Sequence, residues 1–401
     1  MKQFISEHAD DDLNRLLLSA SRYPGIDVAF AVEQIACRRQ IRDKLPSWYS
    51  DDSLIYPAGI AVEQCSSEKT AMYKQRLVDA EAHVCDLTGG LGADSFFLSR
   101  KVRRVTYMER TAKYCDAARH NFACLGADNI DVTEGDATVS LHHLPMPVDV
   151  FYVDPARRNG AGKRIYAIDE CEPDLGALLP SLLQLAPKVI AKLSPMADLT
   201  RTLSILPGVT EIHVLSVGND CKELIFVIER GAKVLPVSAP VHCVHFIQDR
   251  EECFTFSLRE EKDCAAPLAT EGVQAYLYEP NASIMKAGAF RSITRLGVCK
   301  LHVSSHLYTS QQRSDDFPGR RFAVEDIIPL ASKSLGNLHK TIPRANITVR
   351  NFPITANELR LRAGIADGGE TYLFATTLHD NAKALIVCRK MLDTPPSGPN
   401  L

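Results

Sequence analysis

The 401-residue sequence has no run that approaches the roughly 20 apolar residues needed to span a bilayer, so we expect no membrane partner. Its 12 cysteines are scattered singly and form no C-x-x-C pair, which argues against a zinc site. The first residues, Met1–Asp12, are polar and acidic and unlike an export signal. We therefore expect free thiols in a reducing cytoplasm.

Two common nucleotide-binding patterns are also missing. The run Asp86-Leu87-Thr88-Gly89-Gly90-Leu91-Gly92 is a glycine turn, but Ser95 stands where G-x-G-x-x-G requires its third glycine. No Gly-Lys-Ser/Thr follows, so the turn is no phosphate loop. The turn therefore fits either a ligand without phosphate or a purely structural connection.

Charge is distributed unevenly along the chain, although the net charge is only −3. From Lys286 to Arg362, 13 Lys and Arg stand against 5 Asp and Glu, so this segment carries +8 and the remainder −11. Such asymmetry predicts that the C-terminal part meets a polyanion such as RNA. A solvated basic face is the alternative.

The pattern of apolar and polar residues changes along the chain. Residues 1–78 are predicted to be a helical region. In residues 79–232 short apolar runs alternate with helical stretches, which predicts a parallel sheet covered by helices. Residues 233–322 are predicted as a β-rich linker with a small β/α module, and residues 323–393 as a small α/β domain. The Pro- and Gly-rich residues 394–401 are expected to be disordered.

The region 79–232 is expected to form a mostly parallel sheet that closes with one antiparallel strand. Its first five strands are predicted at His83–Leu87, Val102–Glu109, Asn129–Glu134, Val148–Val153 and Val189–Leu193. Two more, Glu211–Val217 and Glu223–Glu229, are separated only by residues 218–222. A parallel pair needs a crossover of about a dozen residues, so this last pair must be an antiparallel hairpin. The usual dinucleotide dehydrogenase domain lacks such a hairpin.

Acidic residues follow the first four strands in order. Asp86 and Glu109 end the first two strands, Asp136 follows the third, and Asp154 ends the fourth. Ligands in such sheets bind at the carboxyl ends of the strands, where a carboxylate can accept hydrogen bonds from ribose hydroxyls or an adenine amino group. Each acid alone could instead cap a helix, but the series is hard to explain by capping.

The run Asp86–Gly92 resembles motif I of the class I methyltransferases that use S-adenosylmethionine (SAM). This resemblance covers about residues 80–231. It implies that the methionine part of SAM is contacted by Asp86, Thr88, Gly90 and Gly92. It also implies that Glu109 binds the ribose and Asp136 the adenine. Thr88 stands where many members have glycine.

The segment before the first strand is a further cofactor candidate. In many class I enzymes this segment folds over the cofactor, so Gln64 and Thr70 are expected to line the pocket. Ser67 could instead simply cap a helix that begins at Glu68.

The run Asp154-Pro155-Ala156-Arg157-Arg158 stands where amino-methylating enzymes carry Asp/Asn-Pro-Pro-Tyr/Phe. The resemblance implies that Asp154 and Pro155 hold the acceptor amine, with Asp154 orienting it or accepting its proton. Arg157 replaces the aromatic residue, and its guanidinium could stack on a base or pair with phosphate.

Arg158 and Lys192 are the expected substrate contacts beside this run. Alternatively, Arg157 and Arg158 could pair with the acids Asp169 and Glu170. Lys192, near the end of the fifth strand, could also merely extend its amine from the sheet edge.

Three segments narrow the resemblance: Val62–Ala71, Asp154–Arg158 and Ala345–Pro353. They resemble methyltransferases that carry a C-terminal THUMP-like domain preceded by a small ferredoxin-like module, over nearly the whole chain. The implied fold is α/β: a Rossmann-like class I sheet with an N-terminal helical region and small C-terminal α/β domains. THUMP domains proper bind RNA.

Methylation of an rRNA or tRNA base with SAM is therefore the expected function. A methyltransferase acting on a protein or small molecule, and a binding protein without catalysis, are the alternatives. No metal is expected. His302 and His306 lie on a strand predicted over Lys300–Tyr308, too far apart to share an ion, and His142 and His143 are taken as ordinary histidines.

Overall fold

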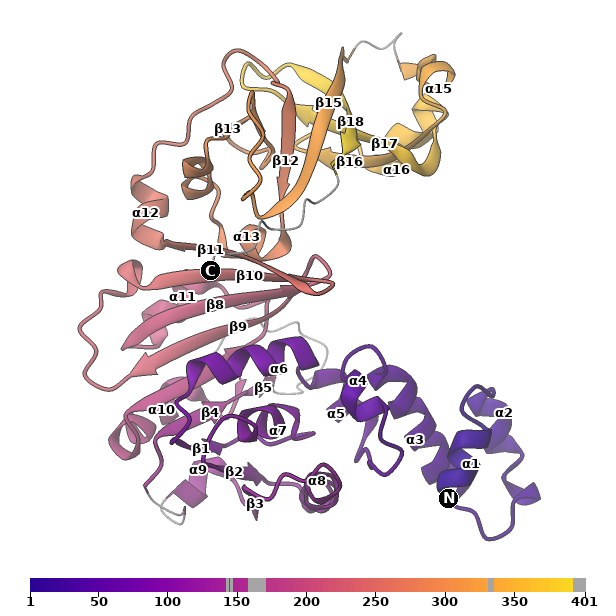
Figure 1. Ribbon diagram of the computed structural model, residues 1–401, viewed down its shortest axis with the longest axis vertical. Helices are drawn as coiled ribbons and strands as arrows, with labels where there is room; N and C mark the ends of the chain where they lie inside the picture. The colour runs from indigo at the N-terminus through magenta and orange to yellow at the C-terminus, as the bar shows by residue number, and fades with distance from the viewer. Residues whose placement is uncertain (142–143, 145–146, 158–170, 331–334, 392–401) are drawn as a thin grey trace, which may run out of the picture. The chain divides into compact units, whose positions relative to one another are not determined.

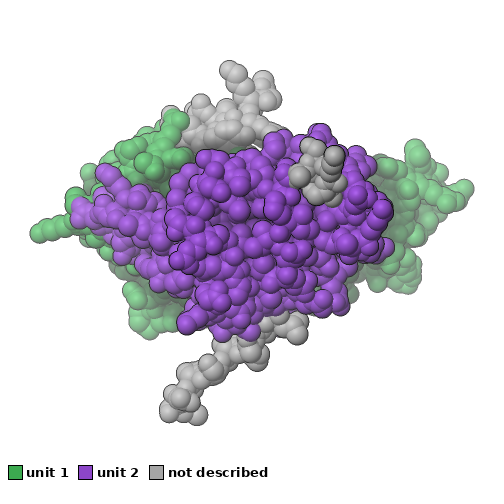
Figure 2. All heavy atoms as spheres, turned by 90° about the horizontal axis from the view of Figure 1, so that it is seen from above, with its two compact units in different colours: residues 1–212, 223–236 green, residues 213–222, 237–401 purple. Residues whose placement is uncertain are grey.

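The computed structural model describes residues 1–141, 144, 147–157, 171–330 and 335–391. It divides into two compact units, residues 1–212 with 223–236 and residues 213–222 with 237–401 (Figure 2). Within the described part of the chain, every helix is too short or too polar to cross a membrane. The side chain of Arg157, all of Arg158 and the expected tail lie outside the described residues.

The first unit begins with short helices, as the sequence predicts (Figure 1). They are α1 (Lys2–Glu7), α2 (Leu13–Leu18), α3 (Val28–Ile41), α4 (Pro46–Tyr49), α5 (Gly59–Gln64) and α6 (Glu68–Lys74). Side-chain oxygens of Asp12, Asp27 and Ser67 accept backbone N–H groups and so begin α2, α3 and α6.

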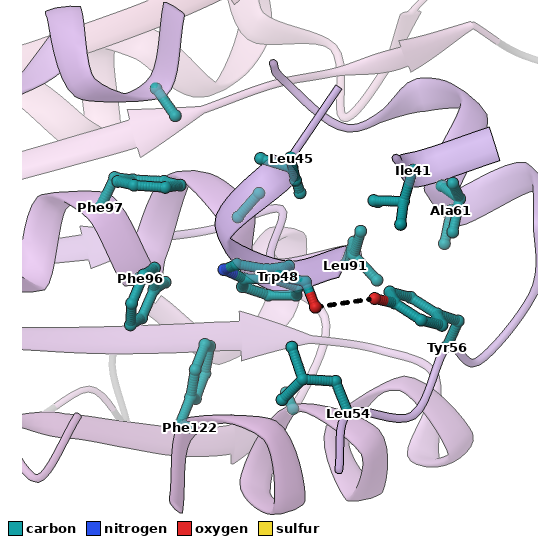
Figure 3. Close-up of a cluster of buried hydrophobic side chains, with 14 of the residues drawn as sticks. Ile41, Leu45, Trp48, Leu54, Tyr56, Ala61, Leu91, Phe96, Phe97 and Phe122 are labelled. Atoms are coloured by element: carbon teal, nitrogen blue, oxygen red, sulfur yellow. Dashed lines mark hydrogen bonds between the residues drawn. The ribbon is translucent and has the colours of Figure 1, made fainter. Parts of the chain in front are cut away.

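The later of these helices share one hydrophobic core with the sheet that follows. Trp48 of α4 is fully buried and lies edge-on to Phe96, with ring centroids 5.7 Å apart (Figure 3). Tyr56 donates a hydrogen bond to the Trp48 carbonyl at 3.5 Å. Ile41, Leu54 and other buried side chains complete this cluster. The burial fixes the α4–α6 segment against the elements that follow β1 and β2.

Seven strands of a nine-stranded sheet have the order β8-β9-β7-β4-β1-β2-β3. These strands are β1 (His83–Asp86), β2 (Arg104–Glu109), β3 (Ile130–Glu134), β4 (Val150–Val153), β7 (Lys188–Leu193), β8 (Val209–Val217) and β9 (Asp220–Glu229). The pairs β1–β2, β2–β3, β1–β4 and β4–β7 are parallel, whereas β9 runs antiparallel to β7. This confirms the Rossmann-like methyltransferase sheet, with the antiparallel strand between β7 and β8.

Helices follow the parallel strands: α7 (Ala93–Ser99), α8 (Ala112–Cys124), α9 (Ala137–Ser140), α10 (Leu175–Leu185) and α11 (Leu199–Ile205). Every residue of β1 and β4 is buried, as expected for a parallel sheet covered on both faces. The chain leaves β1 for β2 on one side, and β4 lies on the other. Ligands bind at such a reversal of strand order, so this arrangement places the candidate site beside β1 and β4.

The second unit holds the outer part of the β8–β9 hairpin, which is followed by β10 (Pro240–Ile247) and β11 (Arg250–Ser257). A separate seven-stranded sheet of this unit has the order β13-β14-β12-β15-β18-β17-β16. These strands are β12 (Tyr276–Pro280), β13 (Cys299–Lys300), β14 (Tyr308–Ser310), β15 (Gly319–Pro329), β16 (Arg344–Arg350), β17 (Ala366–Thr377) and β18 (Lys383–Lys390). The helices in the described part of this unit include α12 (Leu258–Asp263), α13 (Ala282–Ala287), α15 (Leu338–Thr341) and α16 (Ala356–Ala363).

The strand predicted over Lys300–Tyr308 is wrong. The chain turns between β13 and β14, because the amide of Ser304 donates to His302 Nδ1 at 3.0 Å and that of Ser305 to the His302 carbonyl. His306 has a φ of +50°, which no strand residue adopts.

Candidate functional site

The glycine turn begins at a buried carboxylate. Asp86 ends β1 and is 1% exposed. Thr88 N–H donates to its Oδ1 at 3.0 Å and the Ser95 hydroxyl to its Oδ2 at 2.6 Å. Burial raises the pKa of Asp86 to about 7, although these two hydrogen bonds oppose the rise. Asp86 therefore titrates near neutral pH.

Three glycines of the turn are required for different reasons. Gly90 and Gly92 have φ values of +56° and +87°, which side-chain-bearing residues rarely adopt. A methyl group on Gly92 would also lie 2.7 Å from Phe122 Cζ. Gly89, which sequence reasoning did not single out, has an ordinary φ, but a methyl group there would overlap the ring of Tyr107. A side chain would therefore strain the backbone at Gly90 and would clash with an aromatic ring at Gly89 and Gly92.

Glu109 joins the end of β2 to the glycine turn. Its Oε2 accepts the Gly90 N–H at 3.1 Å and its Oε1 accepts the Thr111 N–H at 2.8 Å. Tyr107 donates its hydroxyl to the Gly90 carbonyl at 2.7 Å. A carboxylate oxygen accepts two hydrogen bonds, so each oxygen of Glu109 can still receive a hydroxyl.

Asp136 caps α9. It accepts the Thr138 hydroxyl at 2.6 Å and the Thr138 N–H at 2.7 Å, and these bonds lower its pKa. The capping alternative is thus correct for this side chain, and its contact with adenine stays a prediction.

The segment before β1 shows the expected helix cap. The Ser67 side chain accepts the Thr70 N–H at 3.4 Å, and the Thr70 hydroxyl donates to the Ser67 carbonyl at 3.0 Å. Thr70 is 1% exposed, whereas Gln64 at the end of α5 is exposed. Whether either residue contacts a cofactor stays a prediction.

Asp154 connects the end of β4 to both the glycine turn and β7. Its N–H donates to Thr88 Oγ1 at 2.7 Å, and its Oδ2 accepts Lys192 Nζ at 2.6 Å. Its side chain is 32% exposed, whereas Pro155 is buried. The backbone of Arg157 pairs with that of Cys171 between β5 (Ala156–Arg157) and β6 (Cys171–Glu172). The ends of β1, β2 and β4 therefore form one hydrogen-bonded site.

Behind Asp154 lie charged side chains that sequence reasoning missed. Lys74 of α6 has no exposed surface and its Nζ lies 2.8 Å from Asp94 Oδ1 and 3.0 Å from Glu223 Oε2. Asp94 also accepts the Tyr152 hydroxyl at 2.8 Å. The sequence contains one indication of this buried cluster, because Glu223 stands directly before the apolar run of β9.

Comparison with known proteins matches two domain models to the second unit: a ferredoxin-like domain at residues 276–318 and a THUMP domain-like model at residues 319–390. β12 of the first pairs with β15 of the second, so both contribute to one sheet. The chain is also 38% identical to a candidate methyltransferase from Porphyromonas gingivalis W83. The likeness covers 98% of this chain and 97% of that one, with a TM-score of 0.88.

A shorter likeness concerns a protein-L-isoaspartate O-methyltransferase from Methanoregula boonei. The two are 34% identical over 76 residues, which is 19% of this chain. The matched segment spans about a third (35%) of the length of that curated relative.

Proposed function

Since this chain belongs to the family of methyltransferases that combine a Rossmann-like class I sheet with a ferredoxin-like module and a C-terminal THUMP-like domain, we propose that it transfers a methyl group from SAM to a base of RNA. One observation carries the proposal. Asp86, Glu109 and Asp154 lie at the carboxyl ends of the adjacent strands β1, β2 and β4 and are linked by hydrogen bonds through Thr88 and Gly90.

The residues at these strand ends fit SAM. Glu109 keeps a free lone pair on each oxygen for the two ribose hydroxyls. At Gly90 a methyl group would have no neighbour nearer than the Thr88 carbonyl oxygen at 3.7 Å, so this part of the turn has room for a ligand. The methionine part would be held by Asp86, Thr88, Gly90 and Gly92, the ribose by Glu109 and the adenine by Asp136, with Gln64 and Thr70 as further candidates. When bound, SAM supplies a methyl group activated by its positively charged sulfur.

We expect SAM to bind more tightly as the pH rises through about 7. The pKa of Asp86 is raised to about 7 by burial, and the cationic amino group of SAM favours the ionised carboxylate. Binding at pH 6.5 should therefore release protons, and the release should vanish above pH 8. Calorimetry in buffers of different ionisation enthalpy measures this directly. Equal affinity at pH 6 and pH 8 would contradict the role of Asp86, and Asp86→Asn should abolish the pH dependence.

The acceptor side rests on Asp154. Its carboxylate is partly exposed and its backbone is fixed by Thr88, which supports the proposal that it orients an acceptor group and takes its proton. Pro155, Arg157 and Arg158 are the other residues that we propose to contact the acceptor. Burial raises the pKa of Asp154, while Lys192 opposes the rise.

RNA is proposed as the substrate because of the basic C-terminal segment and its THUMP-like domain. Part of this charge is used internally, since Arg320 and Arg350 both pair with the buried Glu279. Exposed basic side chains remain on the THUMP-like domain, among them Lys340, Arg344 and Arg362. They are the proposed phosphate contacts.

The proposal is tested with methyl-labelled SAM, the full-length protein and total RNA. Label is expected in RNA, and the variant Lys340→Ala/Arg344→Ala/Arg362→Ala should raise KM for RNA while SAM binding is unchanged. Its affinity for RNA should depend less on salt, by about one unit of log–log slope for each lost phosphate contact. Label that enters protein or small molecules but not RNA would contradict the proposal.

The second candidate function is methylation of a protein, favoured by the likeness to the isoaspartate enzyme. The same labelling experiment, with an isoaspartyl peptide in place of RNA, separates the two.

A further inference from the structure

A buried charge cluster of Ser66, Lys74, Asp94, Lys192 and Glu223 lies behind Asp154 in the first unit. Lys74 Nζ donates to Ser66 Oγ at 2.7 Å as well as to Asp94 and Glu223. Ser66 Oγ donates in turn to Asp94 Oδ2 at 2.8 Å. The members come from α6, α7, β7, β9 and the connection between α5 and α6, so the fold assembles them from distant parts of the chain.

Lys192 is the member that reaches the proposed acceptor site. Its Nζ lies 2.6 Å from Asp154 Oδ2, 3.1 Å from Ser66 Oγ, and 3.8 and 3.9 Å from the carboxylates of Asp94 and Glu223. Burial disfavours the ammonium, but the nearby carboxylates, Asp154 above all, raise its pKa. An ammonium held in this way stays charged and faces carboxylates, so it is not free to bind a phosphate.

The cluster and Asp154 together hold more negative than positive charge. Three carboxylates, those of Asp94, Asp154 and Glu223, face the two ammonium groups. Glu223 is 4% exposed, and among the described residues none donates a hydrogen bond to its Oε1. A buried carboxylate oxygen without a donor is costly, so a cation or a group with an N–H or O–H donor would stabilise this arrangement.

We propose that this cluster extends the acceptor site and selects, as methyl acceptor, a nitrogen that carries a hydrogen over an anionic oxygen. The inference rests on the proposed function, and it makes Lys192 and Glu223 positioning residues that act through Asp154 and through the local charge.

The charge movement during transfer fits this selection. The nitrogen lone pair forms the new N–C bond while the S–C bond breaks and its electron pair stays on sulfur. Positive charge therefore passes from sulfur to nitrogen, and excess negative charge nearby stabilises it. The nitrogen then loses its proton to the Asp154 carboxylate. A carboxylate acceptor would instead bring a further negative charge to the cluster, which would repel it.

The test compares the affinities of SAM, whose sulfur is cationic, and S-adenosylhomocysteine, whose sulfur is neutral, by calorimetry at pH 8 on the full-length protein. Glu223→Gln removes one negative charge, so the preference for SAM should fall by about threefold to tenfold. Lys192→Met removes one positive charge, so the preference should rise by a similar factor. A variant that loses its structure would bind SAM and S-adenosylhomocysteine more weakly by the same factor, so the ratio of their affinities would not change.

Matched controls lie on the same strands. Lys188 and Glu229 of β7 and β9 form an outer pair, 3.6 Å apart, and Lys188→Met and Glu229→Gln should leave the ratio as it is. If Glu223→Gln does not fold, Asp94→Asn gives the same test.

The outcomes separate the two proposals. If the unmodified protein binds no SAM, the proposed function and this inference both fail. If SAM binds to the unmodified protein and the folded variants leave the ratio unchanged or shift it in the same direction, only this inference fails. Where RNA takes up label, the methyl group should be on nitrogen, and an alkali-labile ester or a 2′-O-methyl nucleoside would overturn the inference.

Discussion

Replacing Lys74 with methionine is expected to lower the free energy of unfolding by about 3–5 kcal/mol, the cost of leaving buried charges without their partner. Lys74 has no exposed surface and donates to Asp94 at 2.8 Å, to Glu223 at 3.0 Å and to Ser66 at 2.7 Å. Methionine keeps much of the volume but none of the charge. Urea denaturation followed by circular dichroism measures the change.

The difference in free energy of unfolding between the unmodified protein and Lys74→Met should depend on pH. Burial alone would raise the pKa of Asp94, but Lys74 and Lys192 hold it well below its ordinary value of 3.8. A carboxyl group with a lowered pKa stabilises the fold above its ordinary value and loses this contribution in acid. The gap between the two proteins should therefore be widest at neutral pH and narrow below about pH 4.

Lys188→Met is the matched control for this prediction. Lys188 and Glu229 are partly exposed and 3.6 Å apart, so the change should cost about 0–1 kcal/mol. Equal costs for Lys74→Met and Lys188→Met would show that the buried cluster adds nothing special to stability.

Gly89→Ala is expected to abolish SAM binding, or weaken it at least about tenfold, and to destabilise the fold by about 1–3 kcal/mol. The added methyl group would overlap the Tyr107 ring, which is fully buried and donates its hydroxyl to Gly90. Either the ring or the turn must move, and the turn is the proposed cofactor contact. Calorimetry with SAM and thermal unfolding measure the two effects.

Gly59→Ala serves as the control, because Gly59 in α5 has nothing within 4 Å of an added methyl group. Its SAM affinity and stability should be unchanged or slightly better, since alanine favours helix. If Gly89→Ala bound SAM normally, the close approach of Tyr107 would not be part of the cofactor site.

The sheet and its strand ends could be predicted because their signals are local. Apolar runs fix the strands of the first unit to within a few residues, and the short turn at Gly218 requires an antiparallel hairpin. Parallel strands present their carboxyl ends at one edge, so Asp86, Glu109 and Asp154 could be expected to meet there.

The buried charge cluster could not be predicted in the same way. Lys74 and Glu223 are 149 residues apart in sequence, and their pairing depends on how α6 and β9 pack. The role of Asp136 as a cap depends on where α9 begins, which the sequence does not fix well. The strand expected over residues 300–308 failed because side-chain hydrogen bonds of His302 favour a turn.

The β8–β9 hairpin has a consequence for how this protein is made. Its base belongs to the first unit and its tip, residues 213–222, to the second. The strand β9, which lies between β7 and β8, begins within that tip and ends at Glu229. On the ribosome, the first sheet therefore cannot close until residue 229 has emerged, and β7 waits with one edge unpaired. A fragment that ends at Ile212 lacks β9, so the edge of β7 would stay unpaired. A fragment that ends at Pro236 contains β9, which can pair with that edge.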